Sequence, residues 1–155
     1  MSKTKKYQQS GKAYAMPETS LTRVEEMGVA YRSPFQKASI ARKGINTEFV
    51  ADLMLSLDIN KQETARLIDI SAKTLDRHLQ NEKVFKGLQS DRILELADLY
   101  NQGVSVFASR LKFLKWLDSE VPALGGTCPR QWLDTQQGIT AISDELGKIE
   151  HGLFA

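Results

Sequence analysis

The residue types that most often carry catalysis are few in this sequence and widely separated. The two histidines, His78 and His151, lie far apart, and the single cysteine, Cys128, is close to neither. Metal sites and nucleophilic triads need several such side chains that the fold can bring together. We therefore predict no enzyme, no catalytic residue, no cofactor and no metal site, with His78 partly packed and Cys128 buried or half-buried.

The polar side chains of residues 71–80 suit a different chemistry, the reading of DNA. Arginine and glutamine can make bidentate contacts with guanine and adenine edges, while lysine and serine suit phosphates. Asp69 and Asp76 oppose this interpretation because phosphates repel carboxylates, and a helical hairpin that serves only as scaffold is the alternative. The DNA-binding residues predicted from the pattern are Ser71, Lys73, Thr74, Arg77 and Gln80.

Two short helices, over 61–68 and 71–80, must position that polar face. Asn60 can cap the first helix, with Glu63 three residues later completing a capping box. Ser71, at the start of the second helix, is also a good N-cap. Ala65 is small enough for the two helices to cross closely. The pair has the dimensions of a helix-turn-helix.

Apolar residues at helical spacing predict helices along the remainder of the chain. One helix is expected over 47–57. Ser90 is expected to cap a longer helix, which Gly103 interrupts or ends. Another helix is expected from about Ser109 to Asp118, with an apolar face formed by Leu111, Leu114 and Leu117. Thr135 is expected to cap a last helix, whose apolar positions are Ile139, Ile142, Leu146 and Ile149.

The fold class predicted from these segments is all-α, since no stretch alternates as a strand does. No apolar run approaches the roughly 20 residues that span a bilayer, so we expect a soluble, cytoplasmic protein. The net charge of +2 hides an asymmetry, because residues 1–43 hold nine Lys and Arg against three Glu. Residues 1–44 are therefore predicted to be a flexible basic N-terminal segment, either an arm that touches phosphates or only a solubilising tail.

Two stretches of the sequence resemble a known family. Residues 65–71 followed by Thr74 and Leu75 resemble the helix-turn-helix of Xre-type repressors, with Asp69 where glycine is usual. The run PALGG at 122–126, Pro129, LDT at 133–135, Gly138 and LGKIEHGLFA at 146–155 is similar to the toxin-binding domain of Xre/MbcA/ParS antitoxins. This resemblance implies an Xre-like helix-turn-helix domain at 45–90 and a helical toxin-binding and dimerisation domain at 91–155.

The resemblance also implies a function. Such antitoxins push their C-terminal tail into the cleft of a cognate RES-type toxin and block the entry of NAD, which the toxin consumes, and they bind their own promoter DNA. The toxin-binding residues implied here are Glu150, His151, Gly152, Leu153, Phe154 and Ala155. The expected partners are therefore the toxin, operator DNA and a second copy of the chain, with no membrane.

Two alternatives stay open. The apolar residues Leu153 and Phe154 could fold back onto the core instead of entering a partner. The chain could also be a stand-alone helix-turn-helix transcription regulator whose C-terminal domain only dimerises. The apolar stripes of residues 91–117 are the predicted dimer surface, because they exceed what one short bundle needs.

Overall fold

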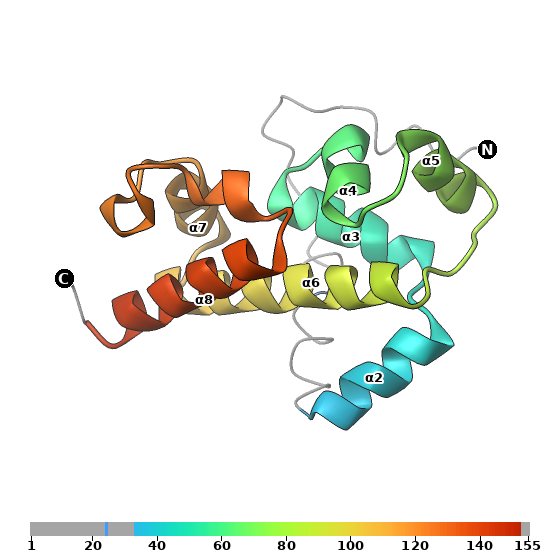
Figure 1. Ribbon diagram of the computed structural model, residues 1–155, viewed down its shortest axis with the longest axis horizontal. Helices are drawn as coiled ribbons and strands as arrows, with labels where there is room; N and C mark the ends of the chain where they lie inside the picture. Colours follow the sequence, from blue (N-terminus) through green and yellow to red (C-terminus); the bar gives the residue numbers. More distant parts are fainter. Residues whose placement is uncertain (1–23, 25–32, 153–155) are drawn as a thin grey trace. The chain divides into compact units, whose positions relative to one another are not determined.

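The computed structural model describes Val24 and residues 33–152 of the 155-residue chain (Figure 1). The described residues are helical, with two isolated β-bridges, Ile45 to Phe85 and Val121 to Thr127, and no longer strand. The all-α class predicted from the sequence is confirmed for this part of the chain. None of the helices described is long and apolar enough to cross a membrane.

The α-helices in chain order are α2 Pro34–Lys43, α3 Thr47–Leu57, α4 Lys61–Leu67, α5 Ala72–Gln80, α6 Leu88–Phe107, α7 Arg110–Leu117 and α8 Gln136–Glu150. Two 3₁₀ turns, η2 Pro122–Leu124 and η3 Pro129–Trp132, lie between α7 and α8. The chain divides into two compact units, Met1–Ala97 and Asp98–Ala155. The division falls inside α6, beyond the residue 90 at which the sequence placed a domain boundary.

The core of the first unit is built around α3. This helix is buried on most of its sides, with Phe49, Leu53 and Leu57 each at most 3% exposed, and its bounds are those predicted. The bridge between Ile45 and Phe85 holds the start of α3 beside the segment that precedes α6. Each of these two residues donates its N–H to the other's carbonyl at 2.8 Å.

The prediction of a flexible segment over residues 1–44 is wrong in its last part. Residues 34–43 form α2, which has a complete capping box. Ser33 Oγ accepts from Gln36 N at 3.1 Å, and Gln36 Oε1 accepts from Ser33 N at 3.2 Å. Pro34 occupies the first turn, where its missing N–H costs nothing. The pair of Ser33 and Pro34 therefore starts this helix.

Two predictions about α6 are also wrong. The helix begins at Leu88, so Ser90 lies within its first turn and donates its hydroxyl to the Phe85 carbonyl instead of capping. Gly103 does not end the helix, which runs to Phe107. A Cβ at Gly103 would lie 2.2 Å from Cε2 of the buried Phe113. The glycine therefore lets α7 pack closely against α6.

Helix α7 begins close to the predicted start, and Ser109 caps it, with Ser109 Oγ accepting from Lys112 N at 3.3 Å. Its buried residues are Phe113, Leu114 and Leu117. The prediction that Leu111 belongs to the same apolar face is wrong, because Leu111 is 72% exposed. Phe113 takes its place in the core, with its ring 6.2 Å from that of Tyr100 and 6.3 Å from that of Trp116.

Helix α8 lies alongside the C-terminal half of α6 (Figure 1). Gln102 Nε2 donates to the Ser143 carbonyl at 3.0 Å, and Ser143 Oγ donates to Gln102 Oε1 at 2.7 Å. Thr135 caps α8 as predicted, and Ile139, Ile142 and Leu146 are buried on its inner face. Ile149 is only half-buried, so the packed stripe weakens toward the end of the helix.

Candidate functional site

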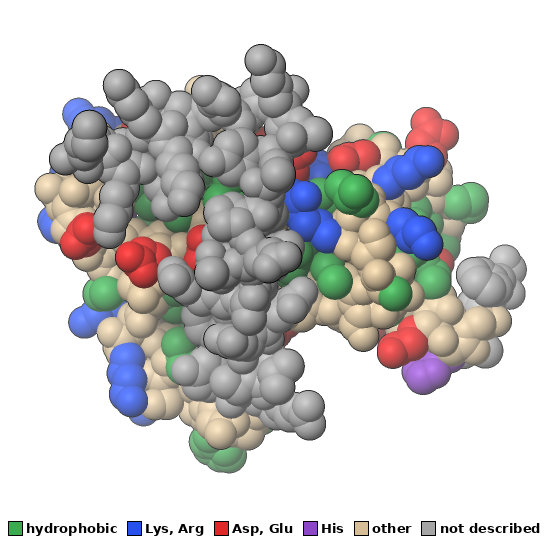
Figure 2. Space-filling view, turned by 180° about the vertical axis from the view of Figure 1, so that it is seen from behind, with side chains coloured by type: hydrophobic (Ala, Val, Ile, Leu, Met, Phe, Trp, Pro, Cys, Tyr) green, Lys and Arg blue, Asp and Glu red, His purple; other side chains and the backbone are tan. Residues whose placement is uncertain are grey.

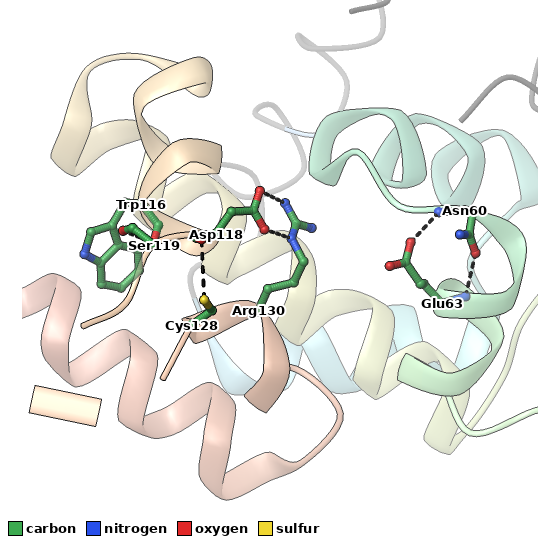
Figure 3. A network of polar contacts seen from close by, with 7 residues as sticks. All are labelled: Asn60, Glu63, Trp116, Asp118, Ser119, Cys128 and Arg130. Atoms are coloured by element: carbon green, nitrogen blue, oxygen red, sulfur yellow. Dashed lines mark hydrogen bonds and ion pairs between the residues drawn. The ribbon is translucent and has the colours of Figure 1, made fainter. Parts of the chain in front are cut away.

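The first candidate site is the helix pair α4 and α5. The N-terminus of α4 carries the predicted capping box, in which Asn60 Oδ1 accepts from Glu63 N and Glu63 Oε2 accepts from Asn60 N, both at 2.9 Å (Figure 3). The buried Ala65 receives the Ile70 N–H on its carbonyl at 3.0 Å. The capping box fixes the start of α4, and the bond from Ile70 to Ala65 closes the short turn between the helices.

Asp69 provides the change of direction in that turn. Its φ is 58°, in the left-handed region where glycine is favoured and where aspartate is tolerated better than most residues. The sequence departs from the Xre-type pattern at this position, and the backbone takes the conformation that a glycine would provide. The turn is therefore kept in spite of the substitution.

Helix α5 presents most of the predicted DNA-binding residues to solvent. Ser71, Lys73, Arg77 and Gln80 are exposed. Thr74 is half-buried, and its hydroxyl lies 2.9 Å from Ser71 Oγ, which also accepts the Thr74 N–H at 3.0 Å as the N-cap. On the opposite side of the helix Leu75 is fully buried, so these polar residues share the outer surface.

An ion pair that the sequence analysis missed joins the two helices. Lys61 Nζ on α4 lies 2.5 Å from Asp76 Oδ1 on α5. Asp76 was expected to oppose DNA binding through its charge. Its ion pair with Lys61 offsets that charge and ties α5 to α4. Little in the sequence indicated this ion pair, because the two residues lie fifteen positions apart and on different helices.

His78 is packed against Phe85, as the sequence predicted, with the two ring centroids 4.7 Å apart. Burial, and then the positive charges of Lys83 and Arg77, lower the pKa of His78 below its ordinary value of 6.5. These surroundings therefore favour the neutral form of the His78 imidazole. No group of three or more His, Cys, Asp or Glu able to hold a metal ion occurs among the described residues.

The second candidate site is the unit Asp98–Ala155, whose loops are closed by short-range bonds. The backbone pair Val121 and Thr127 closes a turn in which Gly125 and Gly126 have φ values of 70° and 72°. Thr127 Oγ1 donates to the Leu124 carbonyl at 2.7 Å and accepts from Trp132 Nε1 at 2.7 Å. The double glycine thus makes a turn that most other residues would strain.

Asp118 ties the end of α7 to the turn η3. Arg130 donates from Nε to Oδ1 at 2.5 Å and from Nη2 to Oδ2 at 3.1 Å, a bidentate pair (Figure 3). Cys128 is half-buried, as predicted, and its Sγ donates to the Asp118 carbonyl at 3.4 Å. The cysteine therefore serves the packing of this turn.

The predicted toxin-binding residues begin where α8 ends. Glu150 is the last residue of the helix, His151 is its C-cap, and Gly152 follows with a φ of 67°. These three residues are exposed. Leu153, Phe154 and Ala155, which the sequence analysis also assigned to toxin binding, lie outside the described residues.

Apolar side chains remain on the surface of this unit. Leu111 on α7 is 72% exposed, and Trp132 at the end of η3 is 43% exposed. Figure 2 shows hydrophobic side chains open to the surface next to Lys and Arg side chains. The other apolar residues of the predicted dimer surface are largely buried within the chain, Ile93, Leu96, Leu99 and Leu117 among them.

The fold and these two sites define an all-helical protein with a capped, outward-facing polar helix followed by a helical unit with apolar surface residues. Residues 102–152 match the sequence model of the family described as the antitoxin Xre/MbcA/ParS C-terminal toxin-binding domain. The resemblance predicted from the sequence is therefore confirmed for this part of the chain, which is similar to the toxin-binding domain of Xre/MbcA/ParS antitoxins.

Relatives from several bacteria agree with this assignment. The antitoxin Xre of Yersinia enterocolitica is 25% identical over 74% of this chain and 78% of its own. The Prs ADP-ribosylating antitoxin of a Sphingobium species is 25% identical over 79% of this chain and 83% of its own. The antitoxin Xre of Photorhabdus laumondii is 23% identical over 76% of this chain and 80% of its own. The similarity thus extends well beyond residues 102–152.

Proposed function

We propose that this antitoxin neutralises a RES-type toxin by placing residues 150–155 in the cleft where the toxin binds NAD. The observation that carries the proposal is the match of residues 102–152 to a toxin-binding domain, directly before the tail. Helix α8 ends at Glu150, and the left-handed Gly152 turns the chain out of the helix. In the sequence Leu153 and Phe154 follow, two apolar side chains of the kind that fill a cleft.

Exclusion of NAD needs only the occupation of space. Burying a phenylalanine side chain contributes about 2 kcal/mol, and a short tail adds to the affinity that the helical unit already provides. The name of the Sphingobium relative refers to ADP-ribosylation, a reaction that uses NAD as its donor. This supports a toxin that consumes NAD, and we place both proteins in the cytoplasm, where NAD is available.

Co-expression with the toxin encoded next to the antitoxin gene tests the tail. Deletion of residues 152–155 is expected to restore growth arrest, while circular dichroism shows the truncated chain still helical. Replacement of the exposed Gln136, at the other end of α8, by alanine is a control that should keep the cells growing. Normal growth with the truncated chain would assign the tail to the core instead.

We further propose that α4 and α5 act as a helix-turn-helix that binds the promoter of the antitoxin's own operon. The exposed face with Lys73, Arg77 and Gln80 supports this, as does the ion pair that offsets Asp76. One such helix pair makes few contacts, so a homodimer on two half-sites is expected. The exposed Leu111 is the remaining candidate for the dimer contact from the predicted surface.

Two substitutions at one position test the DNA proposal. Arg77→Ala is expected to weaken promoter binding by about 1–3 kcal/mol if the guanidinium reads a base. Arg77→Lys keeps the positive charge but loses the bidentate fork. If residue 77 contacts a base, the lysine variant should bind as weakly as the alanine variant. If it contacts a phosphate, the lysine variant should bind like the unchanged chain. Full affinity and specificity in both variants would show that α5 is scaffold.

A further inference from the structure

The bridge between Ile45 and Phe85 brings together two basic segments that lie forty residues apart in the sequence. The mutual hydrogen bonds of these two residues make the pairing antiparallel, so residue 44 faces residue 86. A Cβ on Gly44 would lie 3.1 Å from Lys86 Cγ, which shows how closely the two segments pack. Helix α2 delivers its last turn, with Arg42 and Lys43, to the same place.

Four exposed cations gather at this bridge. Neither residues 40–46 nor residues 83–90 contain an aspartate or a glutamate. Like charges on paired segments repel each other, so the arrangement favours a partner that supplies negative charge from outside. We call these four residues the bridge cations: Arg42, Lys43, Lys83 and Lys86.

The cluster is continuous with the outer face of α5. Lys83 lies in the turn after α5, where its N–H donates to the His78 carbonyl at 3.1 Å. The positive charges of Lys83 and Arg77 both lower the pKa of His78, so both cations lie near that side chain. The positive charge therefore extends from the predicted base-reading helix to the bridge.

We propose that the bridge cations bind the phosphate backbone of DNA beside the groove that α5 enters. The proposal rests on the proposed DNA-binding function and adds contacts that carry no sequence information, because phosphates are the same at every step. DNA presents a regular row of phosphates, so it can pair with several cations at once. A single carboxylate on a protein partner could pair with only one of them.

The salt dependence of DNA binding by the full chain tests this proposal. Each phosphate contact contributes about −0.9 to the slope of log affinity against log salt concentration. Lys83→Gln with Lys86→Gln, and separately Arg42→Gln with Lys43→Gln, should each make the slope shallower by up to about 1.8 per bound chain. The second pair keeps the test valid if the first disturbs the packing at Gly44.

The matched control is Lys112→Gln with Lys115→Gln, which removes two exposed cations from α7. Its slope should equal that of the unchanged chain. The affinities of each bridge variant for the promoter and for a random duplex should fall by the same factor, whereas Arg77→Ala should affect the promoter more. This difference separates phosphate contacts from base contacts.

Three outcomes would overturn the proposal, and they differ in what they imply for the DNA-binding function. Promoter binding by the unchanged chain, with unchanged slopes in both bridge variants, would leave the DNA-binding function intact and reject the bridge contacts. Failure of the unchanged chain to bind either duplex would reject the DNA-binding function together with the inference. Weakened toxin binding in the bridge variants, with unchanged salt slopes, would assign the cations to the protein partner and also overturn it.

Discussion

Two glycines of α8 allow the packing of the toxin-binding unit to be tested with one kind of substitution. Gly138 and Gly147 both lie within the helix, and each can be changed to alanine. Alanine in a helix is favoured over glycine by about 1 kcal/mol when nothing else changes. The surroundings of the two positions differ, so the structure predicts effects of opposite sign.

A methyl group at Gly138 meets backbone that cannot move independently. Its Cβ would lie 2.0 Å from the Trp132 carbonyl oxygen and 2.8 Å from Thr135 Oγ1, the cap of α8. Overpacking costs about 1–3 kcal/mol, and a disturbed N-cap adds about 1 kcal/mol. Nothing lies within 4 Å of a Cβ at Gly147. After subtracting the gain in helix propensity, we expect Gly138→Ala to destabilise the fold by about 1–3 kcal/mol and Gly147→Ala to stabilise it by up to about 1 kcal/mol.

Urea unfolding followed by circular dichroism measures both variants under the same conditions. The midpoint should fall for Gly138→Ala and rise slightly for Gly147→Ala, with neutralisation of the toxin weakened only by the first. Equal midpoints for the two variants would refute the close approach of Trp132 to α8. A fall in both would show that Gly147 has a neighbour that the structure does not place there.

Three further predictions concern single positions. Gly103→Ala should lower the unfolding free energy by about 1–3 kcal/mol through overpacking against Phe113, and the loss should be smaller when Phe113→Leu is present; additive losses in urea unfolding would contradict this. Because the pKa of His78 is lowered in the fold, its contribution to stability is fully present above pH 6.5 and is lost as the pH falls toward the folded-state pKa. His78→Gln should therefore flatten the decline of the urea midpoint on acidification, and an unchanged profile would be the opposing result. Asp69→Gly should raise the unfolding free energy by ~0.5 kcal/mol because the φ of 58° no longer strains a side chain, and a lower melting temperature would argue against it.

Local signals in the sequence predicted helix starts well. The caps at Asn60, Ser71 and Thr135 lie where they were expected, because a capping side chain bonds backbone only two or three residues away. The left-handed turn at Asp69 was also within reach, since a turn of this kind follows from a short stretch of sequence.

The misses depended on contacts between distant residues. Gly103 looked like a helix stop until the ring of Phe113 was seen to occupy the space of its missing side chain. Leu111 and Phe113 are both apolar residues of α7, and only the packing against α6 decides which one is buried. The ion pair of Lys61 with Asp76 likewise depends on how two helices cross.

The cluster at the Ile45–Phe85 bridge could not be predicted for the same reason. One of its segments belongs to residues 1–44, which were predicted to be flexible, and the other follows the predicted helix over 71–80. The family resemblance was easier to predict, because the closing residues from 122 onward carry it in nearly consecutive sequence.

We propose that the chain neutralises an NAD-consuming toxin through its C-terminal unit and tail. NAD consumption by the purified toxin, titrated with the full chain and with a chain lacking residues 152–155, tests it most directly. The full chain is expected to stop NAD consumption, whereas the truncated chain should still bind the toxin in a pull-down and leave much of the consumption intact. Equal inhibition by both chains, or none by either, would contradict the account.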